Sequence, residues 1–283
     1  MEGDGSGQVR LTAGPDDRAP RWSADGARIA FTRCAGEAST CDIWIMDGDG
    51  TDPFDVTGTP GVGETSPAWS PDGEQIVMVR DGHLVIRDLL DGSELPLTSG
   101  PRVDTSPVWS PDGTTIAYST DGFVATIRPD GTDSQIFSIA GEVGDWSPDS
   151  QQLVIALDNG IDPGPIVATL DRHGSNLVEL TDPEIDVPDD PRWSPDGSRL
   201  LYIDIDGFDR LITMDVDGTH RIGLDVGAFT SADWQPVGPR TPTFPPVTPI
   251  TTTTSTSSST TTVAVAPTST APRPSAAAPR FTG

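Results

Sequence analysis

One short motif recurs along the chain and constrains its fold more than any other feature of the sequence. The motif reads W-S-P-D-G or a close variant, and a degenerate W-Q-P-V-G copy follows the others. Its tryptophans are spaced by 37 to 47 residues and are Trp22, Trp69, Trp109, Trp146, Trp193 and Trp234. A tandem unit of this length is typical of a four-stranded propeller blade.

The residues after each tryptophan follow the pattern of a half-buried strand. Positions seven and nine after the first five tryptophans are large and hydrophobic; they are Ile29, Ile76, Ile116, Leu153 and Leu200, then Phe31, Met78, Tyr118, Ile155 and Tyr202. Because side chains alternate across a strand, each pair lies on one face, which we expect to be buried between sheets. A third strand, a Gly-bearing turn and a fourth strand follow in each copy. The turn glycines at 50, 92, 131, 174 and 218 are expected to adopt positive φ.

Composition and charge narrow the function. Hydrophobic residues make up 34% of the chain, with 30 Gly and 28 Pro, which favours short strands and tight turns over helices. The chain holds 43 acidic and 17 basic residues, and a net charge of -26 has the wrong sign for sequence-independent nucleic-acid binding. No apolar run is long enough to cross a bilayer, so we expect no direct membrane insertion.

The whole repeat, xPxWSPDGxxIAF followed by IxxMxxDG and LT, resembles the WD40-like (PD40) repeat of the TolB family. The resemblance covers roughly residues 1–238. It implies an all-β, six-bladed TolB-like β-propeller around a central channel, with a role in protein association for TolB itself. The same repeat also occurs in fusions to peptidases and kinases, so it predicts the fold better than the function.

The repeat register predicts five complete four-stranded blades and one incomplete closing blade. Residues 8–12 align with an outermost strand, and residues 231–236 align with the innermost strand of that same closing blade. The two middle strands of the closing blade have no counterpart in the alignment. We therefore expect the natural chain to extend upstream by about 20 residues, the length of the two absent strands.

A second segment begins after the propeller. Residues 239–283 are rich in Thr, Ser, Pro and Ala and contain no carboxylate, a composition that predicts a disordered C-terminal tail. This tail is interpreted as a flexible spacer or, alternatively, as a glycosylated stalk outside the cell.

Two cysteines, Cys34 and Cys41, flank the turn between the second and third strands of the first full repeat. A hairpin brings such positions within reach of a disulfide, which favours an oxidising compartment. We expect an exported protein, in the periplasm, at the cell wall or outside the cell. The alternative is a pair of free thiols in a cytoplasmic protein.

Little in the sequence indicates catalysis or a cofactor. His83, His173 and His220 fall in turns of two types that lie at opposite ends of a propeller, and no G-x-S-x-G motif is present. We expect no enzyme activity and no cofactor. Residues 47–52 resemble the opening of a calcium loop, which leaves Ca²⁺ as an alternative, although the repeat alignment makes them a hairpin. The aspartate of every W-S-P-D-G motif recurs so regularly that we assign it to the turn.

Acidic residues a few positions before each of the first five tryptophans are the better candidates for a site. They stand where the innermost strands begin and are Asp17, Glu64, Asp104, Glu142 and Asp189. Five carboxylates around one channel mouth would attract a metal ion or a basic peptide. The alternative is a solvated acidic rim without a ligand.

These features favour a monomeric, non-catalytic propeller scaffold for protein–protein interaction. The alternative is a regulatory, sensory or substrate-gating module of a peptidase-like or kinase-like enzyme.

Overall fold

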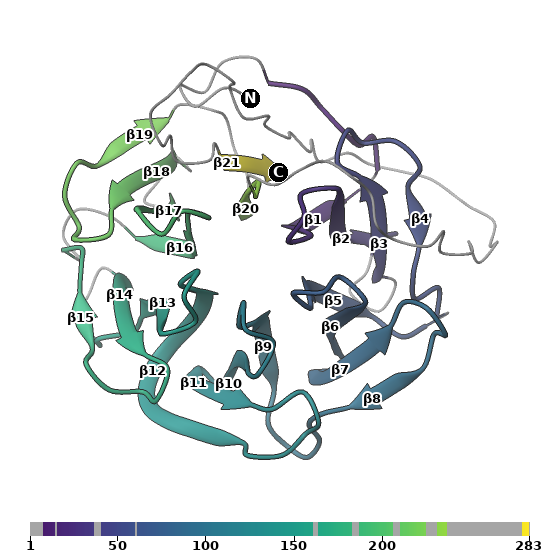
Figure 1. Ribbon diagram of the computed structural model, residues 1–283, viewed down its shortest axis with the longest axis horizontal. Helices are drawn as coiled ribbons and strands as arrows, with labels where there is room; N and C mark the ends of the chain where they lie inside the picture. Colours follow the sequence, from purple (N-terminus) through teal and green to yellow (C-terminus); the bar gives the residue numbers. More distant parts are fainter. Residues whose placement is uncertain are drawn as a thin grey trace.

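The computed structural model describes residues 8–14, 16–36, 41–59, 61–160, 164–182, 187–205, 210–224 and 231–236, and the backbone of residues 279–282. All regular structure within these residues is β, and no helix of the length and apolar character needed to span a membrane occurs among them. The sheets stand side by side around a common centre (Figure 1), as the repeats predict.

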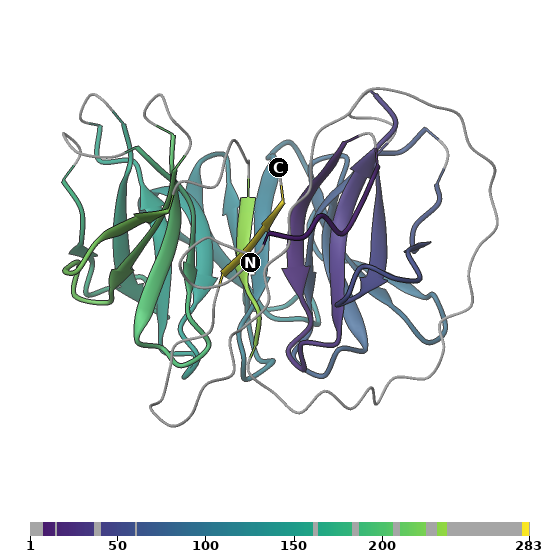
Figure 2. The ribbon, with the colours of Figure 1, turned by 90° about the horizontal axis from the view of Figure 1, so that it is seen from above.

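The first two sheets are antiparallel and have four strands each in sequence order, from the centre outward. The first contains β1 (Asp17–Trp22), β2 (Arg28–Cys34), β3 (Cys41–Asp47) and β4 (Phe54–Asp55). The second contains β5 (Glu64–Trp69), β6 (Gln75–Arg80), β7 (His83–Asp88) and β8 (Glu94–Pro96). Their first strands run along the central axis (Figure 2).

The next sheet has seven strands because one long strand, β12, belongs to two repeats. It contains β9 (Asp104–Trp109), β10 (Ile116–Thr120), β11 (Phe123–Ile127), β12 (Gln135–Trp146), β13 (Gln152–Leu157), β14 (Ile166–Asp171) and β15 (Val178–Glu179). The first half of β12 pairs with β11 as an outer strand, and its second half pairs with β13 as an inner strand.

Two further sheets complete the ring of Figure 1. One has four strands: β16 (Pro188–Trp193), β17 (Arg199–Asp204), β18 (Arg210–Asp215) and β19 (Ile222–Leu224). The other pairs β20 (Ser231–Trp234) with β21 (Pro279–Thr282), so residues 279–282 of the tail are extended and paired rather than disordered. The rest of the predicted disordered tail lies outside the described residues.

The N-terminal segment differs from the prediction. We expected residues 8–12 to form an outermost strand, but only an isolated bridge residue, Val9, is found there. Leu11 instead packs against the apolar face of the first sheet, on a cluster that contains Trp22, Ile29 and Phe31. Contact with this face anchors the segment without a strand ladder.

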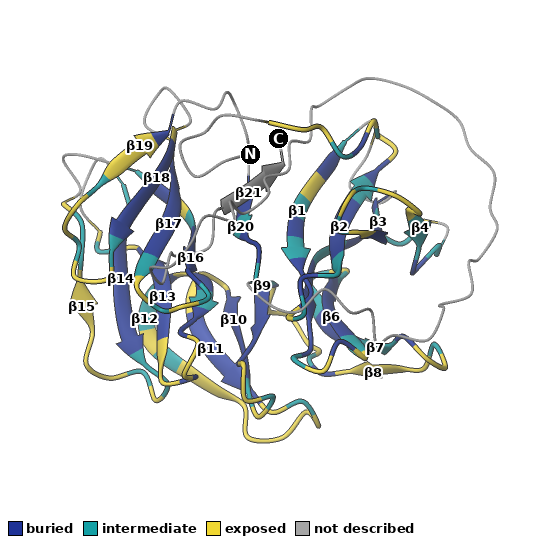
Figure 3. Ribbon diagram, turned by 45° about the horizontal axis from the view of Figure 1, so that its top comes forward, coloured by how far each residue is buried: buried dark blue, intermediate teal, exposed yellow. Residues whose placement is uncertain are grey.

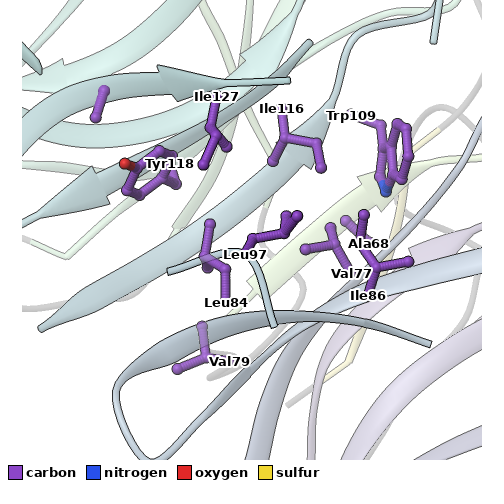
Figure 4. Close-up of a cluster of buried hydrophobic side chains, with 11 residues drawn as sticks. Ala68, Val77, Val79, Leu84, Ile86, Leu97, Trp109, Ile116, Tyr118 and Ile127 are labelled. Atoms are coloured by element: carbon purple, nitrogen blue, oxygen red, sulfur yellow. The ribbon is translucent and has the colours of Figure 1, made fainter. Parts of the chain in front are cut away.

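The core lies between neighbouring sheets, where the repeat pattern predicts it. In Figure 4, Val77, Leu84 and Ile86 of the second sheet face Trp109 and Ile116 of the next, all nearly fully buried. The ten residues at positions seven and nine after the tryptophans are all buried, at 3% exposure or less. The second and third strands of the sheets are the most continuously buried, and exposed residues gather in the turns and outermost strands (Figure 3).

Each W-S-P-D-G turn is held by its own serine and aspartate. In the first copy, the Ser23 hydroxyl donates to Asp25 at 2.7 Å and accepts from the Arg28 backbone N–H at 2.9 Å. The Asp25 carboxylate also accepts from the Ala27 N–H at 3.0 Å. The four later copies repeat these bonds, which confirms that the recurrent aspartate belongs to the turn. The five predicted turn glycines all have positive φ, between 72° and 89°.

Candidate functional site

The five acidic residues predicted at the channel mouth fall into two classes, because they occupy two different register positions. Asp17, Glu64 and Asp104 each pair with the last or next-to-last residue of the second strand. The positions equivalent to these three are held by Gly141 and Pro188 in the later repeats, and Glu142 and Asp189 come one residue after them. A shift of one residue along a strand turns the side chain to the opposite face.

The first class is buried within the sheets. Asp17 is 2% exposed and accepts two hydrogen bonds from Arg33, at 2.6 and 2.8 Å. Glu64 is fully buried and pairs with Arg80 at 2.8 Å. Each of these arginines comes from the second strand of the same sheet, so the pairs hold adjacent strands together.

Asp104 belongs to the same class but contacts the preceding sheet. It is 3% exposed and accepts a hydrogen bond of 2.5 Å from the hydroxyl of Thr98. The same hydroxyl accepts from the backbone N–H of Leu84, at the start of the third strand of the second sheet. Asp104 thus links two neighbouring sheets.

Burial affects the titration of Glu64 strongly. Desolvation raises the pKa of this carboxyl to about 7, against the opposing influence of the Arg80 guanidinium. One of its oxygens is buried without a hydrogen-bond partner. These surroundings suit a structural carboxyl and leave it inaccessible to a ligand in the channel.

The second class is exposed and comes together in one place. Glu142 and Asp189 line a cavity of about 310 Å³ with Thr105, Ser106 and Asp190. These residues come from β9, from the second half of β12 and from β16, each a few residues before the tryptophan of its repeat. Glu142 accepts hydrogen bonds from the hydroxyls of Thr105 at 3.0 Å and Ser106 at 3.3 Å. The cavity walls desolvate Asp189 and raise its pKa. We call this cavity the acidic pocket.

Charged residues directly before the tryptophans lie along the channel itself. Arg21, Asp145, Arg192 and Asp233 occupy this position, where the second and third repeats carry Ala68 and Val108. Together with the tryptophans and several prolines, they line a second cavity of about 420 Å³ at the end of the channel formed by the W-S-P-D-G turns.

Asp190 joins three sheets near the point where the ring closes. Its carboxylate pairs with Arg21 of the first sheet at 3.1 Å and with Arg192 of its own strand. It also accepts from the backbone N–H of Ala232 in β20 at 3.2 Å. A second carboxylate in this region, Asp233, accepts from the Trp22 N–H at 2.7 Å.

The carboxylates of this channel cluster have raised pKa values. Burial raises the pKa of Asp145 to about 8, and the neighbouring Asp233 carboxylate adds to the shift. Burial also raises the pKa values of Asp190 and Asp233 to about 6, against the opposing Arg21 guanidinium. Of these three carboxyls, Asp145 therefore retains at neutral pH a proton that a free aspartate would release.

Two tryptophans link adjacent inner strands through hydrogen bonds from their indole N–H groups. The indole N–H of Trp69 donates to the backbone carbonyl of Arg21 at 3.0 Å, and that of Trp146 donates to Val108 at 3.3 Å. In both cases the acceptor precedes the tryptophan of the preceding repeat. This contact fixes the spacing of the strands that carry the channel residues.

The remaining predicted residues lie away from the channel. His83 begins β7, with Nδ1 3.8 Å from Asp104, and His220 contacts Asp215 at 2.8 Å in a turn of another sheet. His173 is exposed in a third sheet. Across the part of the chain that the structure describes, no group of three His, Cys, Asp or Glu residues is placed to hold a metal ion.

The proposed calcium segment and the cysteine pair are both in hairpins. Residues 47–52 form the turn between β3 and β4, where Asp49 accepts from the backbone N–H and the hydroxyl of Thr51, at 3.0 and 2.7 Å. Cys34 and Cys41 face each other across β2 and β3 and are linked by a disulfide.

Sequence reasoning missed the residues directly before the tryptophans, Asp145 and Asp233 among them. The signal was present, because this position is apolar in two repeats and charged in four. In a propeller it faces the channel, so a charge there calls for a partner or a ligand.

Comparison with known proteins agrees with this architecture. A family model described as the TolB beta propeller domain (PD40) matches residues 1–238. No curated protein sequence matches the chain.

Several solved structures share the fold. TolB from Acinetobacter baumannii superposes with a TM-score of 0.61 at 20% identity, over 71% of this chain and 53% of that protein. The match thus spans about half the length of that relative. A chain of a nidogen/laminin complex gives a TM-score of 0.60 at 14% identity, over 74% and 80% of the two chains. Oligogalacturonate lyase from Vibrio parahaemolyticus gives 0.57 at 12% identity, over 80% and 71%.

Proposed function

Because the chain belongs to the TolB β-propeller domain family, we propose that it is a non-catalytic scaffold that binds a basic segment of another protein at the acidic pocket. The observation that carries the proposal is the pairing of two exposed carboxylates, Glu142 and Asp189, in one cavity at the mouth of the channel. No arginine pairs with either of them among the salt bridges of the described residues.

Electrostatics supports a basic partner. The acidic pocket lies on a chain with a net charge of -26, so a cationic segment is attracted from a distance before it makes contact. Thr105 and Ser106 add hydroxyls that hold Glu142 in place and can bond a peptide backbone. The pocket walls are parts of three inner strands, which gives the site a rigid frame.

The proposal includes a ring of six blades, the last of them built on β20. In that ring the inner strands each contribute one tryptophan to the cavity of about 420 Å³, which fits a single central channel. The Cys34–Cys41 disulfide supports a location in an oxidising compartment outside the cytoplasm.

A second candidate is a module that regulates or gates an enzyme. The similarity to oligogalacturonate lyase shows that this fold is compatible with an enzyme. The positions of the three histidines on different sheets favour the scaffold instead.

The test measures binding of a fluorescent peptide of alternating Lys and Gly by anisotropy, at several salt concentrations. We expect binding that weakens as salt rises and that falls about tenfold in the Glu142→Gln/Asp189→Asn variant, since two charge contacts are lost. The control variant, Glu74→Gln/Glu179→Gln, removes the same charge from exposed positions outside the pocket.

The comparison of the two variants separates a site from general attraction. Equal weakening in both would mean that only net charge matters and would reject the acidic pocket as the site. Cleavage of the peptide or of an oligogalacturonate by the native chain would overturn the proposal of a non-catalytic scaffold.

A further inference from the structure

The inner strand β20 differs from the other described inner strands because the strand that pairs with it is distant in the sequence. The other inner strands pair with the strand that follows them across a short turn, such as residues 23–27 between β1 and β2. β20 pairs antiparallel with β21, which comes after residues 235–278. In Figure 1, β21 lies beside β20, on the side away from the ring centre.

The backbone register shows which strand β21 replaces. In the first sheet, Trp22 pairs with Ile29, the position seven residues after the tryptophan. In the last sheet, Trp234 pairs with Pro279, so β21 occupies the place of a second strand. The sequences agree at two of four positions, because Phe281-Thr282 matches Phe31-Thr32 in this register.

The other two positions of β21 are a poor match for this place. In the other repeats, one residue of the second strand pairs with the residue directly before the tryptophan. This second-strand residue is a fully buried small or branched apolar side chain in each of them: Ala30, Val77, Ala117, Val154 and Leu201. The tail has Arg280 in this position. Opposite the tryptophan it has Pro279, which lacks the N–H that a strand with neighbours on both sides uses.

The long connection weakens the pairing further. The entropy of closing a loop rises with its length, and a connection of residues 235–278 replaces a five-residue turn. The loop-closure relation gives an effective concentration roughly 25-fold lower for β21 than for a second strand joined by such a turn. β21 is also short, with 4 residues against 7 in β2.

We propose that β20 is an acceptor site for an extended segment of another polypeptide, and that β21 is its exchangeable occupant. The segment that fits best has the second-strand pattern of the repeat: a large apolar residue opposite Trp234, a small apolar residue opposite Asp233, and a large apolar residue next. Main-chain hydrogen bonds supply the affinity and the alternating side chains supply the selectivity. This site is distinct from the acidic pocket.

The experiment uses the full chain and a fluorescent peptide with the sequence of residues 26–33, which contains every residue of β2 except Cys34. Three chains are compared by anisotropy: the native chain, a Pro279→Ile/Arg280→Ala variant whose tail matches residues 29–32, and a Phe281→Ala variant with a poorer tail strand. The control peptide carries proline in place of Ala30, which removes a main-chain donor from the centre of the strand.

We expect the peptide to bind the native chain, to bind the Pro279→Ile/Arg280→Ala variant at least about tenfold more weakly, and to bind the Phe281→Ala variant several-fold more tightly. The proline peptide should bind none of them. Circular dichroism and thermal unfolding establish that each variant is folded.

Equal affinity in all three chains, or no binding by any of them, would overturn the proposal. Concentration-dependent dimers that the peptide does not dissociate would also overturn it, because they would mean that β21 is exchanged only between copies of this chain.

Discussion

The strongest test of the two classes of acidic residue compares the stability of Asp17→Asn with that of Glu142→Gln. Asp17 is 2% exposed and bonded at 2.6 and 2.8 Å to Arg33, whose guanidinium also lies 5.0 and 4.6 Å from the rings of Phe31 and Trp44. Replacing the carboxylate leaves this guanidinium without its counter-charge. Breaking a buried ion pair in this way costs about 3 kcal/mol of the free energy of unfolding.

Glu142 is exposed, and the hydroxyls that bond to it can bond to water instead. Its replacement should change stability by no more than about 0.5 kcal/mol. Urea unfolding followed by tryptophan fluorescence measures both variants. With a slope of about 3 kcal/mol per molar urea, Asp17→Asn should lower the midpoint by about 1 M, and Glu142→Gln should leave it almost unchanged.

A third variant tests the cause of the loss. Adding Arg33→Met to Asp17→Asn removes the unpaired charge, so the double variant should cost about 1 to 3 kcal/mol less than the two single changes added together. The reasoning is refuted if Asp17→Asn shifts the midpoint no more than Glu142→Gln, or if the single changes simply add.

Three further predictions follow from the described contacts. Gly144→Ala should destabilise the protein by more than about 2 kcal/mol in the same urea assay, because a Cβ there would lie 2.2 Å from the carbonyl oxygen of Pro191. Unchanged stability would mean that the strands carrying Gly144 and Pro191 can move apart without a cost in stability. Between the unfolded pKa of 3.8 and the folded pKa of about 8, folded Asp145 retains a proton that the unfolded chain releases. The free energy of unfolding should therefore fall as pH rises, by at most about 1.4 kcal/mol per pH unit. Urea titrations at several pH values should show that Asp145→Asn makes this dependence on pH weaker. Reducing the Cys34–Cys41 disulfide should cost about 2.5 kcal/mol, measured as a shift of the urea midpoint with and without reductant, and no shift would mean that the thiols are already free.

The sheets and the core could be predicted from the sequence because each repeat contains the same apolar spacing and the same turn residues. A tryptophan followed at positions seven and nine by large apolar residues marks a buried strand in each of the first five copies, as Ile116 and Tyr118 illustrate at 0% and 3% exposure. The turns were predictable for the same reason, since Asp-Gly pairs such as Asp91-Gly92 meet the local demand for positive φ.

The strand β21 could not be predicted from composition. It lies in a segment of Thr, Ser, Pro and Ala that lacks the apolar density of a folded domain. Only its pairing with β20 reveals the match of Phe281-Thr282 to Phe31-Thr32, because four residues are too few to be recognised as a repeat. Composition predicts how a segment behaves on its own, whereas β21 forms by pairing with β20, a strand distant in the sequence.

The five acidic residues look alike in the sequence, but the structure places them in two different environments. All five precede a tryptophan, so similarity alone placed them in one group, yet Asp17 stands five residues before Trp22 and Glu142 stands four before Trp146. Side chains alternate along a strand, and that one residue moves a carboxylate from an ion pair inside the sheet to the wall of the acidic pocket. Gly141 and Pro188 hold the buried position in the later repeats, and the acid follows one residue later. The residue types at these two adjacent positions therefore decide whether a carboxylate is buried in the sheet or lines the acidic pocket, while the W-S-P-D-G turn stays the same.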